Sequence, residues 1–312
     1  MATGLDKIFL ILAIAEFIIG MLGNVFIGLV NCSEWVKNQK VSSADFILTC
    51  LAISRIGQLL VILFDSFLVG LAPHLYTTYR LGKTVIMLWH MTNHLTTWLA
   101  TCLSIFYFLK IAHFSHSLFL WLRWRMNRVI LMLLILSLFL LIFDSLLLEI
   151  FIDISLNYII DKSNLTLYLD ESKTLYDKLL ILLSLTYFIP FSLSLTSLLL
   201  LFLSLVRHTR NLQLNSLGSR DSSTEAHKRA MKMVMSFLFL FIVHFFSLQL
   251  ANWIFFMLWN NKCIKFVMLA LNAFPSGHSF ILILGNSKLR QTALRLLWHL
   301  RNYLKTPNPL PL

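Results

Sequence analysis

Charged side chains are scarce in this sequence. Of its 312 residues, 13% are charged and 58% are hydrophobic, which excludes an ordinary soluble domain. The same apolar content excludes a disordered chain, because there is ample surface to bury. The short alternating segments of a transmembrane β-barrel are lacking as well. The chain has instead several apolar runs longer than the roughly 20 residues that a helix needs to cross a bilayer. We therefore expect an all-α membrane protein.

Cysteine is also scarce. The cysteines fall in different apolar runs at different depths, so we expect no structural disulfide, and none of their spacings suits a metal site. A cleavable signal peptide is not evident, because the leading segment has no net positive charge and the first apolar run is too long. The four cysteines are Cys32, Cys50, Cys102 and Cys263.

Seven apolar runs predict a single seven-transmembrane helix bundle without a soluble domain. No tandem repeat and no matching pair of broken helices is found, which disfavours a transporter built from inverted repeats. Residues 286–312 are expected to form a short tail. The predicted helices span residues 8–30, 45–71, 84–112, 129–152, 178–206, 230–259 and 263–285.

The distribution of positive charge predicts the orientation of the bundle. Of the 26 Lys and Arg residues, 17 lie in or beside the segments after the first, third, fifth and seventh helices. Positive charge marks cytoplasmic segments, so the N-terminus is predicted outside and the tail in the cytoplasm. This also explains the net charge of +12 without nucleic acid as a partner. The sequon at Asn164 falls on the predicted outside and is a glycosylation candidate, whereas the one at Asn31 falls on the inside.

The third predicted helix changes character along its length. Trp89 and Asn93 lie four residues apart near its outer end, and Tyr107 and Lys110 lie near its inner end. The 18 steps from Trp89 to Tyr107 span about 27 Å and return to the same helix face. We expect this helix to be the axis of the molecule, in contact with a small molecule at one end and a protein at the other. The alternative for Trp89 is an anchor at the membrane interface.

Arg55 lies in the middle of the second predicted helix, where a cation is costly and needs partners. Asn24 on the first helix is a natural partner, and Ser279 on the seventh is another. The guanidinium is then either a structural lock or a conformational switch. Pro190 and Pro275 each predict a bend, which is either a tolerated kink or a hinge.

Four acidic residues also lie within or near the predicted spans. Their bias toward the outer ends favours a wetted vestibule over a proton relay, because the sequence places no basic residue beside them. A metal site built from His90, His94, His244 and His278 is not expected, because His278 lies too deep. The acidic residues are Glu16, Asp65, Asp144 and Glu149.

Six motifs in order resemble one receptor family. They are EFIIGMLGNVFIGLVNC, LAISR, FYFLKIA, IPFSLSL with SLLLLFLSLVRHTR, STEAHKRAMK and PSGHSFILILGNSKLRQ. Together they resemble the type 2 (bitter) taste receptors, which are G-protein-coupled receptors, over essentially the whole chain. The sequence lacks the Asp-Arg-Tyr, the Asn-Pro-x-x-Tyr and the outer disulfide of rhodopsin-like receptors, as this family does. Gly277 replaces the cysteine expected in the last motif, which loosens the seventh helix.

The resemblance implies a plasma-membrane receptor, not an enzyme, that binds small bitter compounds in the outer half of the bundle. Phe241 stands where many relatives carry Tyr, which makes the implied pocket more apolar. Met268 stands where a carboxylate recognises cations in relatives, so a weaker preference for strong bases is expected. The implied ligand contacts are Trp89, Asn93, His94, Thr186, Phe241, His244, Phe245, Met268 and Leu271.

The resemblance also implies coupling to a gustducin-type heterotrimeric G protein, with phospholipase C and calcium signalling downstream. Each inner cation has an alternative role in binding lipid headgroups. The implied activation network comprises Asn24, Arg55, Pro190, Pro275, His278 and Ser279. The implied G-protein contacts are Tyr107, Lys110, Arg207, His208, Arg210, His227 and Lys228.

Other classes remain as alternatives. A vomeronasal type 1 or other chemosensory receptor would share the architecture but not LAISR together with HSFILILGN. A seven-helix enzyme would need a metal cluster or a nucleophile constellation at one depth. A channel or transporter is disfavoured by the missing repeats. A current that is independent of a G protein would distinguish a channel from a receptor.

Overall fold

The computed structural model describes the backbone in six segments of the chain. Side chains are described over most of these segments, but not at residues 38, 79, 151, 154–160, 168–177, 211–215, 222–228, 252–257, 262–264 and 304–305. The six segments are residues 4–38, 42–71, 79–160, 168–215, 222–257 and 262–305.

Every regular element in these segments is an α-helix. Seven of the helices are long and apolar enough to cross a membrane, which confirms the prediction of an all-α, seven-helix membrane protein. The helices are α1 (Gly4–Asn38), α2 (Ser43–Leu71), α4 (Tyr79–Ile111), α5 (Ser117–Trp124), α6 (Met126–Ile160), α7 (Tyr168–Asn215), α8 (Ser222–Met257), α9 (Lys262–Gly285) and α10 (Ser287–Lys305).

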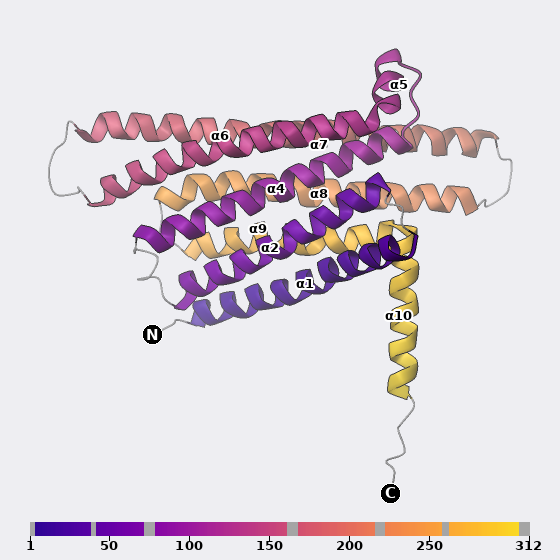
Figure 1. Ribbon diagram of the computed structural model, residues 1–312, viewed down its shortest axis with the longest axis horizontal. Helices are drawn as coiled ribbons and strands as arrows, with labels where there is room; N and C mark the ends of the chain where they lie inside the picture. The colour runs from indigo at the N-terminus through magenta and orange to yellow at the C-terminus, as the bar shows by residue number, and fades with distance from the viewer. Residues whose placement is uncertain are drawn as a thin grey trace, which may run out of the picture.

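The seven long helices lie side by side and alternate in direction (Figure 1). Helix α1 packs on α2 and α9, α2 packs on α4, and α7 to α9 follow in order, so the ring is closed. Helix α4 contacts α2, α6 and α7. In its apolar part 61% of the residues are buried, against 22% in α6, so α4 is the central helix and α6 a peripheral one.

The interior and the exterior of the bundle are both apolar. Phe106, Leu201 and Phe274 are buried in the interior, whereas Phe139 and Phe239 are each 67% exposed on the outside. In water such exposed surface would drive aggregation, but lipid tails are as apolar as these side chains. The exterior therefore fits a bilayer.

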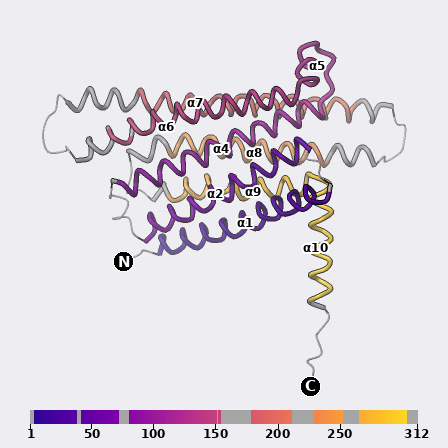
Figure 2. The backbone as a smooth tube through the Cα atoms, in the orientation of Figure 1, coloured from indigo at the N-terminus to yellow at the C-terminus, as the bar shows by residue number. Residues whose placement is uncertain are grey.

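The two ends of the chain lie at opposite ends of the bundle, as the backbone trace shows (Figure 2). Helix α1 begins at one end, and α10 begins at the other. We refer to these as the N-terminal end and the C-terminal end of the bundle. An odd number of spans requires this arrangement.

Several helices extend beyond the predicted spans. Helix α7 runs from Tyr168 to Asn215 rather than over 178–206, and Pro190 lies inside it without ending it. Pro275 likewise lies inside α9. Hydropathy reports only the part of a helix that lipid can cover, whereas the backbone hydrogen bonds continue into the polar flanks.

Two helices were not anticipated from the sequence. Helix α5 begins after His116, whose Nδ1 accepts a hydrogen bond from the Leu118 amide, and its Phe119 packs on Phe108 and Phe114. Helix α10 occupies most of what was expected to be a plain tail and leaves the bundle at a steep angle (Figure 1). Its exposed leucines and Trp298 alternate with basic residues at helical spacing, which is typical of a helix at a membrane interface.

Candidate functional site

Arg55 is fully buried and is held by neutral partners from α9. Its Nη1 donates to Oγ of Ser279 over 3.3 Å, and its Nη2 donates to Nδ1 of His278. Its guanidinium carbon lies 5.4 Å from the centre of the Phe274 ring. Because arginine can only donate, His278 Nδ1 accepts, and this imidazole is neutral with its proton on Nε2. The contact joins α2 to α9 in the interior of the bundle.

Asn24 completes this network from α1. Ser279 Oγ lies 2.8 Å from Asn24 Oδ1, and Asn24 Nδ2 donates to the carbonyl oxygens of Gly20 and Pro275. The direct Asn24–Arg55 pair anticipated from the sequence is therefore replaced by a relay through Ser279. A Cβ atom on Gly20 would lie 2.6 Å from Ser276 Oγ and 2.8 Å from Leu59 Cδ1, so a larger residue would require these side chains to shift.

Trp89 and Asn93 lie on α4 toward the N-terminal end of the bundle. Trp89 is half-buried and packs against an apolar cluster of Tyr187, Leu248, Val267 and Leu271 from α7, α8 and α9. Asn93 is fully buried, and its Oδ1 accepts from Gln58 Nε2 over 3.2 Å. The pair thus connects α4 to four other helices. Met268 is half-buried one turn from Leu271, and Thr186 is buried with its hydroxyl bonded to the Leu183 carbonyl.

An aromatic stack fills the interior one layer deeper. Phe241 is 1% exposed, with its ring centre 5.9 Å from that of Phe191 and 5.7 Å from that of Phe274. Phe245 stacks on Phe191 at 3.8 Å, and His244 stacks on Phe274 at 4.5 Å. These sequence-predicted ligand contacts are packed against protein. Phe274 touches both this stack and the Arg55 guanidinium.

His94 contacts α6 rather than α7, α8 or α9, which carry the predicted ligand contacts outside α4. Its Nε2 bonds to the Ser137 carbonyl oxygen over 3.0 Å, and its Nδ1 lies 3.4 Å from Oδ2 of Asp144, both on α6. His90, one turn earlier on α4, lies beside it. The structure thus separates His94 from Trp89 and Asn93.

The acidic residues of α6 have basic neighbours, contrary to the expectation from the sequence. Lys83 Nζ lies 3.0 Å from Glu149 Oε1 and 3.1 Å from Asp153 Oδ1. These residues are far apart in sequence, and only the packing of α4 on α6 brings them together. The expectation that no basic residue lies beside the acidic residues is therefore wrong for Glu149.

The C-terminal end of the bundle presents exposed cations. Lys110 closes α4, with its Nζ 5.3 Å from the centre of the Phe106 ring, and Tyr107 is half-buried beside it. Arg207, His208 and Arg210 are exposed at the end of α7. The side chains of His227 and Lys228, like Asn164, lie outside the described residues.

A groove of about 620 Å³ opens at the same end, between α8, α9 and α10. Arg229, Lys232 and Arg290 line it together with apolar side chains that include Met233 and Leu284. The described lining carries three cations and no carboxylate. A Cβ atom on Gly285 would collide with the Met233 side chain, so a larger residue where α9 passes α8 would force Met233 to move.

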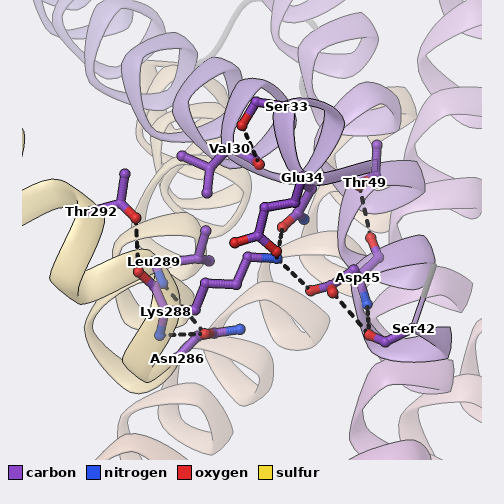
Figure 3. Close-up of polar contacts among 11 residues, drawn as sticks. Val30, Ser33, Glu34, Ser42, Asp45, Thr49, Asn286, Lys288, Leu289 and Thr292 are labelled. Atoms are coloured by element: carbon purple, nitrogen blue, oxygen red, sulfur yellow. Dashed lines mark hydrogen bonds and ion pairs between the residues drawn. The ribbon is translucent and has the colours of Figure 1, made fainter. Parts of the chain in front are cut away.

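Lys288 ties α10 to the first two helices (Figure 3). Its Nζ lies 2.6 Å from Oε2 of Glu34, 3.2 Å from Oδ1 of Asp45 and 3.1 Å from Oδ1 of Asn31. Asn286 caps the start of α10 by accepting from the Lys288 amide over 3.0 Å. The angle of α10 is thus set by a cap and by an ion-pair cluster.

Sequence reasoning missed the residues that act through distant partners. Phe274, Tyr187 and Lys83 contact residues of other helices, and no local motif marks them. Lys288 stands within the last of the six motifs, but that motif does not indicate its partners on α1 and α2. Asp144 carried a signal, because it is a single acid deep within an apolar run, as did the four-residue spacing of His90 and His94.

Comparison with known proteins gives a consistent result. Residues 1–301 match the family model described as taste receptor protein (TAS2R). The chain is 91% identical to taste receptor type 2 member 42 of Homo sapiens and 90% identical to that of Pan troglodytes. It is 87% identical to that of Pongo pygmaeus, and each alignment covers the whole of both chains.

Proposed function

Because this chain belongs to the taste receptor (TAS2R) family, we propose that it binds small bitter compounds among its helices and activates a gustducin-type heterotrimeric G protein. Family membership itself makes it a bitter taste receptor, a multi-pass plasma-membrane protein and not an enzyme. What is proposed is where the ligand binds, how the signal crosses the bundle and which partner receives it.

The observation that carries the proposal is the position of α4. This central helix has Trp89 in the apolar cluster of α7, α8 and α9 at one end and the exposed Lys110 at the other. A flat indole beside an amide is a suitable surface for amphipathic ligands of varied shape. Trp89, Asn93, Met268 and Leu271 are the proposed ligand contacts, with Thr186 close by.

Phe241, His244 and Phe245 have a second role in this proposal. They pack below the ligand region, and Phe274 connects them to Arg55. A ligand that moves α8 or α9 would disturb this stack and thereby the Arg55–His278–Ser279 contacts. The stack offers a physical route between two sites. Pro190 and Pro275 lie on the two helices that would bend.

The N-terminal end of the bundle is proposed to lie outside the cell, because the cations gather at the other end. There Tyr107, Lys110, Arg207, His208 and Arg210 would face the G protein. The groove lined by Arg229, Lys232 and Arg290 adds a positive, partly apolar surface that complements an acidic amphipathic helix. His227 and Lys228 belong to the same proposed surface. Phospholipase C and calcium release would follow.

The test is a calcium assay in cells that express the receptor with or without a taste-type Gα subunit, using a panel of bitter compounds. We expect responses only with the Gα subunit. Trp89→Ala should raise the half-maximal concentration of an active compound about tenfold, as loss of one aromatic contact does. Leu88→Ala, whose side chain is 46% exposed on the outer face of α4, should leave it unchanged.

Two outcomes would contradict the proposal. A compound-induced current in cells without the Gα subunit would favour a channel. Equal effects of Trp89→Ala and Leu88→Ala would place the ligand elsewhere. Surface labelling of each variant keeps these outcomes separate from a failure to reach the membrane.

A further inference from the structure

Three titratable side chains meet in the interior between α4 and α6. His90, His94 and Asp144 are 4%, 2% and 1% exposed, and each places one potential ligand atom within 4.8 Å of the others. The cluster adjoins the apolar cluster proposed to bind bitter ligands, because Tyr187 belongs to that apolar cluster and its hydroxyl contacts His90. Its residues come from two helices that are far apart in sequence.

The hydrogen bond of His94 determines where its proton lies. Its Nε2 faces the Ser137 carbonyl oxygen at 3.0 Å, and a carbonyl can only accept, so Nε2 carries the proton. In the neutral imidazole, Nδ1 then carries a lone pair and can only accept. That lone pair faces Oδ2 of Asp144 at 3.4 Å, and the carboxylate is also an acceptor. Two acceptors face each other, and a cation between them would satisfy both.

His90 repeats this pattern. Its Nδ1 lies 2.7 Å from the hydroxyl of Tyr187 on α7, while its buried Nε2 has no hydrogen-bond partner. If Nδ1–H donates to the Tyr187 oxygen, Nε2 carries the lone pair and is the nitrogen that can bind a metal ion. A ligating histidine commonly donates its other N–H to a carbonyl or a similar oxygen, and both histidines have such an oxygen in place.

Asp144 supplies the negative charge. Neither of its oxygens accepts a hydrogen bond, although both are buried. A carboxylate taken out of water without donors is costly, and in the hydrophobic part of a membrane it needs a counter-cation. Two imidazoles with one carboxylate form a ligand set typical of zinc, with a fourth position left open.

We propose that His90, His94 and Asp144 form a binding site for a divalent transition-metal ion, best matched by Zn²⁺, that links α4 to α6. Rotations that move the ligand atoms by roughly 1 Å would bring them to zinc distances of about 2.0–2.2 Å. Glu149 and Asp153 continue the acidic line along α6 toward the N-terminal end, and both are partly exposed beside Lys83. This line is a route by which a cation can enter.

The expectation of no histidine metal site considered histidines alone. His244 stacks on Phe274 and His278 accepts from Arg55, so neither joins the cluster. Asp144 stood out in the sequence as a buried acid, but nothing local placed it beside His90 and His94. The packing of α6 on α4 supplies the third ligand.

The direct test measures zinc on the purified full-length receptor in lipid nanodiscs by equilibrium dialysis and elemental analysis. We expect one Zn²⁺ per chain that is lost in His94→Asn and in Asp144→Asn, and a melting temperature that rises with Zn²⁺ only in the unmodified chain. Tyr187→Phe keeps all three ligands but removes the oxygen that orients His90. It should weaken binding by about 10- to 100-fold.

Two matched variants serve as controls. Asp65→Asn changes another buried aspartate, on α2, and should retain the zinc. His113→Asn with His208→Asn removes two histidines whose ring centres lie 6.2 Å apart at the C-terminal end, and should remove only weak surface binding.

A spectroscopic measurement needs no variant and covers the case in which Asp144→Asn fails to fold. Co²⁺ bound to the unmodified receptor should show the intense visible absorption of a tetrahedral site and should be displaced by Zn²⁺. An absorption spectrum that shows only octahedral Co²⁺ would overturn the proposal. Equal zinc content in the His94→Asn and unmodified chains would also overturn it. The cluster would then be a proton-mediated contact between His94 and Asp144.

Discussion

Oγ of Ser279 lies 2.8 Å from Oδ1 of Asn24, and this contact joins α9 to α1 beside the buried guanidinium of Arg55. One small side chain thus lies between the amide and the cation. Since α2, α9 and α1 all meet there, the serine is one of the points at which polar contacts close the ring of helices.

Ser279→Ala should destabilise the receptor. The change removes one acceptor of Arg55 and leaves Asn24 Oδ1 without its contact to α9, which should cost about 1–2 kcal/mol in a membrane protein. Thermal unfolding of purified receptor measures the effect. Ser192→Ala is the matched control, because Ser192 bonds only to the carbonyl of its own helix at Phe188. Equal melting temperatures of the two variants would show that the relay adds no stability.

Phe241→Ala should destabilise the bundle far more than Phe239→Ala. Phe241 is fully buried in the aromatic stack, so its removal leaves a cavity that costs about 3–5 kcal/mol. Phe239, two residues away on the same helix, is 67% exposed toward lipid. Surface expression and melting temperature of both variants measure the difference. Similar losses in both would mean that Phe241 is not a packing residue.

Lys288→Met should loosen α10. Without the ammonium, Glu34 and Asp45 remain near each other with no shared cation, and the expected loss is about 1 kcal/mol because the cluster is partly exposed (Figure 3). The distribution of distances between spin labels on α10 and α2 should broaden. Arg295→Met, an exposed cation on the same helix, is the control. High salt should reproduce the effect in the unmodified chain, and a salt-independent distance would argue against an ion-pair clamp.

Met268→Glu should shift the ligand profile toward amines. Met268 lies half-buried on α9, one turn from Leu271 in the apolar cluster, where a carboxylate would attract a cationic ligand. Responses to amine and neutral bitter compounds should therefore change in opposite directions. Met268→Gln has nearly the same shape without the charge and should show no such shift. An unchanged profile in Met268→Glu, or simple amines as the strongest agonists of the unmodified receptor, would contradict this prediction.

Asn164→Gln should remove the glycan and the mobility shift caused by glycosidase treatment. Its sequon follows the fourth membrane span, on the proposed outer side. Asn31→Gln should change nothing in that assay, because Asn31 is 1% exposed and its Oδ1 accepts from Lys288. A glycan that survives Asn164→Gln but not Asn31→Gln would reverse the proposed orientation.

The sequence predicted the number and class of the helices because lipid imposes a simple rule. A spanning helix must be apolar over about 20 residues and must satisfy its own backbone, and both properties are local. The same rule gives no information about helical segments that lie outside the lipid. For that reason the polar extension of α7 and the two shorter helices α5 and α10 were not predicted.

The partners of Arg55 could be predicted in part from the sequence. A guanidinium in the membrane needs partners, and the polar residues Asn24 and Ser279 were identified from depth alone. The sequence did not predict that Ser279 would lie between Asn24 and Arg55, since that arrangement depends on the rotation of three helices. Lys83, which pairs with Glu149 and Asp153, had no local signal of any kind.

The sequence by itself determined that this protein crosses a membrane seven times and which residues are too polar to face lipid. Only the tertiary structure decided which of them meet: that His94 faces Asp144, that Ser279 lies between Asn24 and Arg55, and that Lys288 joins α10 to α1 and α2. The physical reason is that hydropathy depends on the residues within one helix. The pairing of polar side chains depends on the rotation and tilt of neighbouring helices, which all their contacts set together.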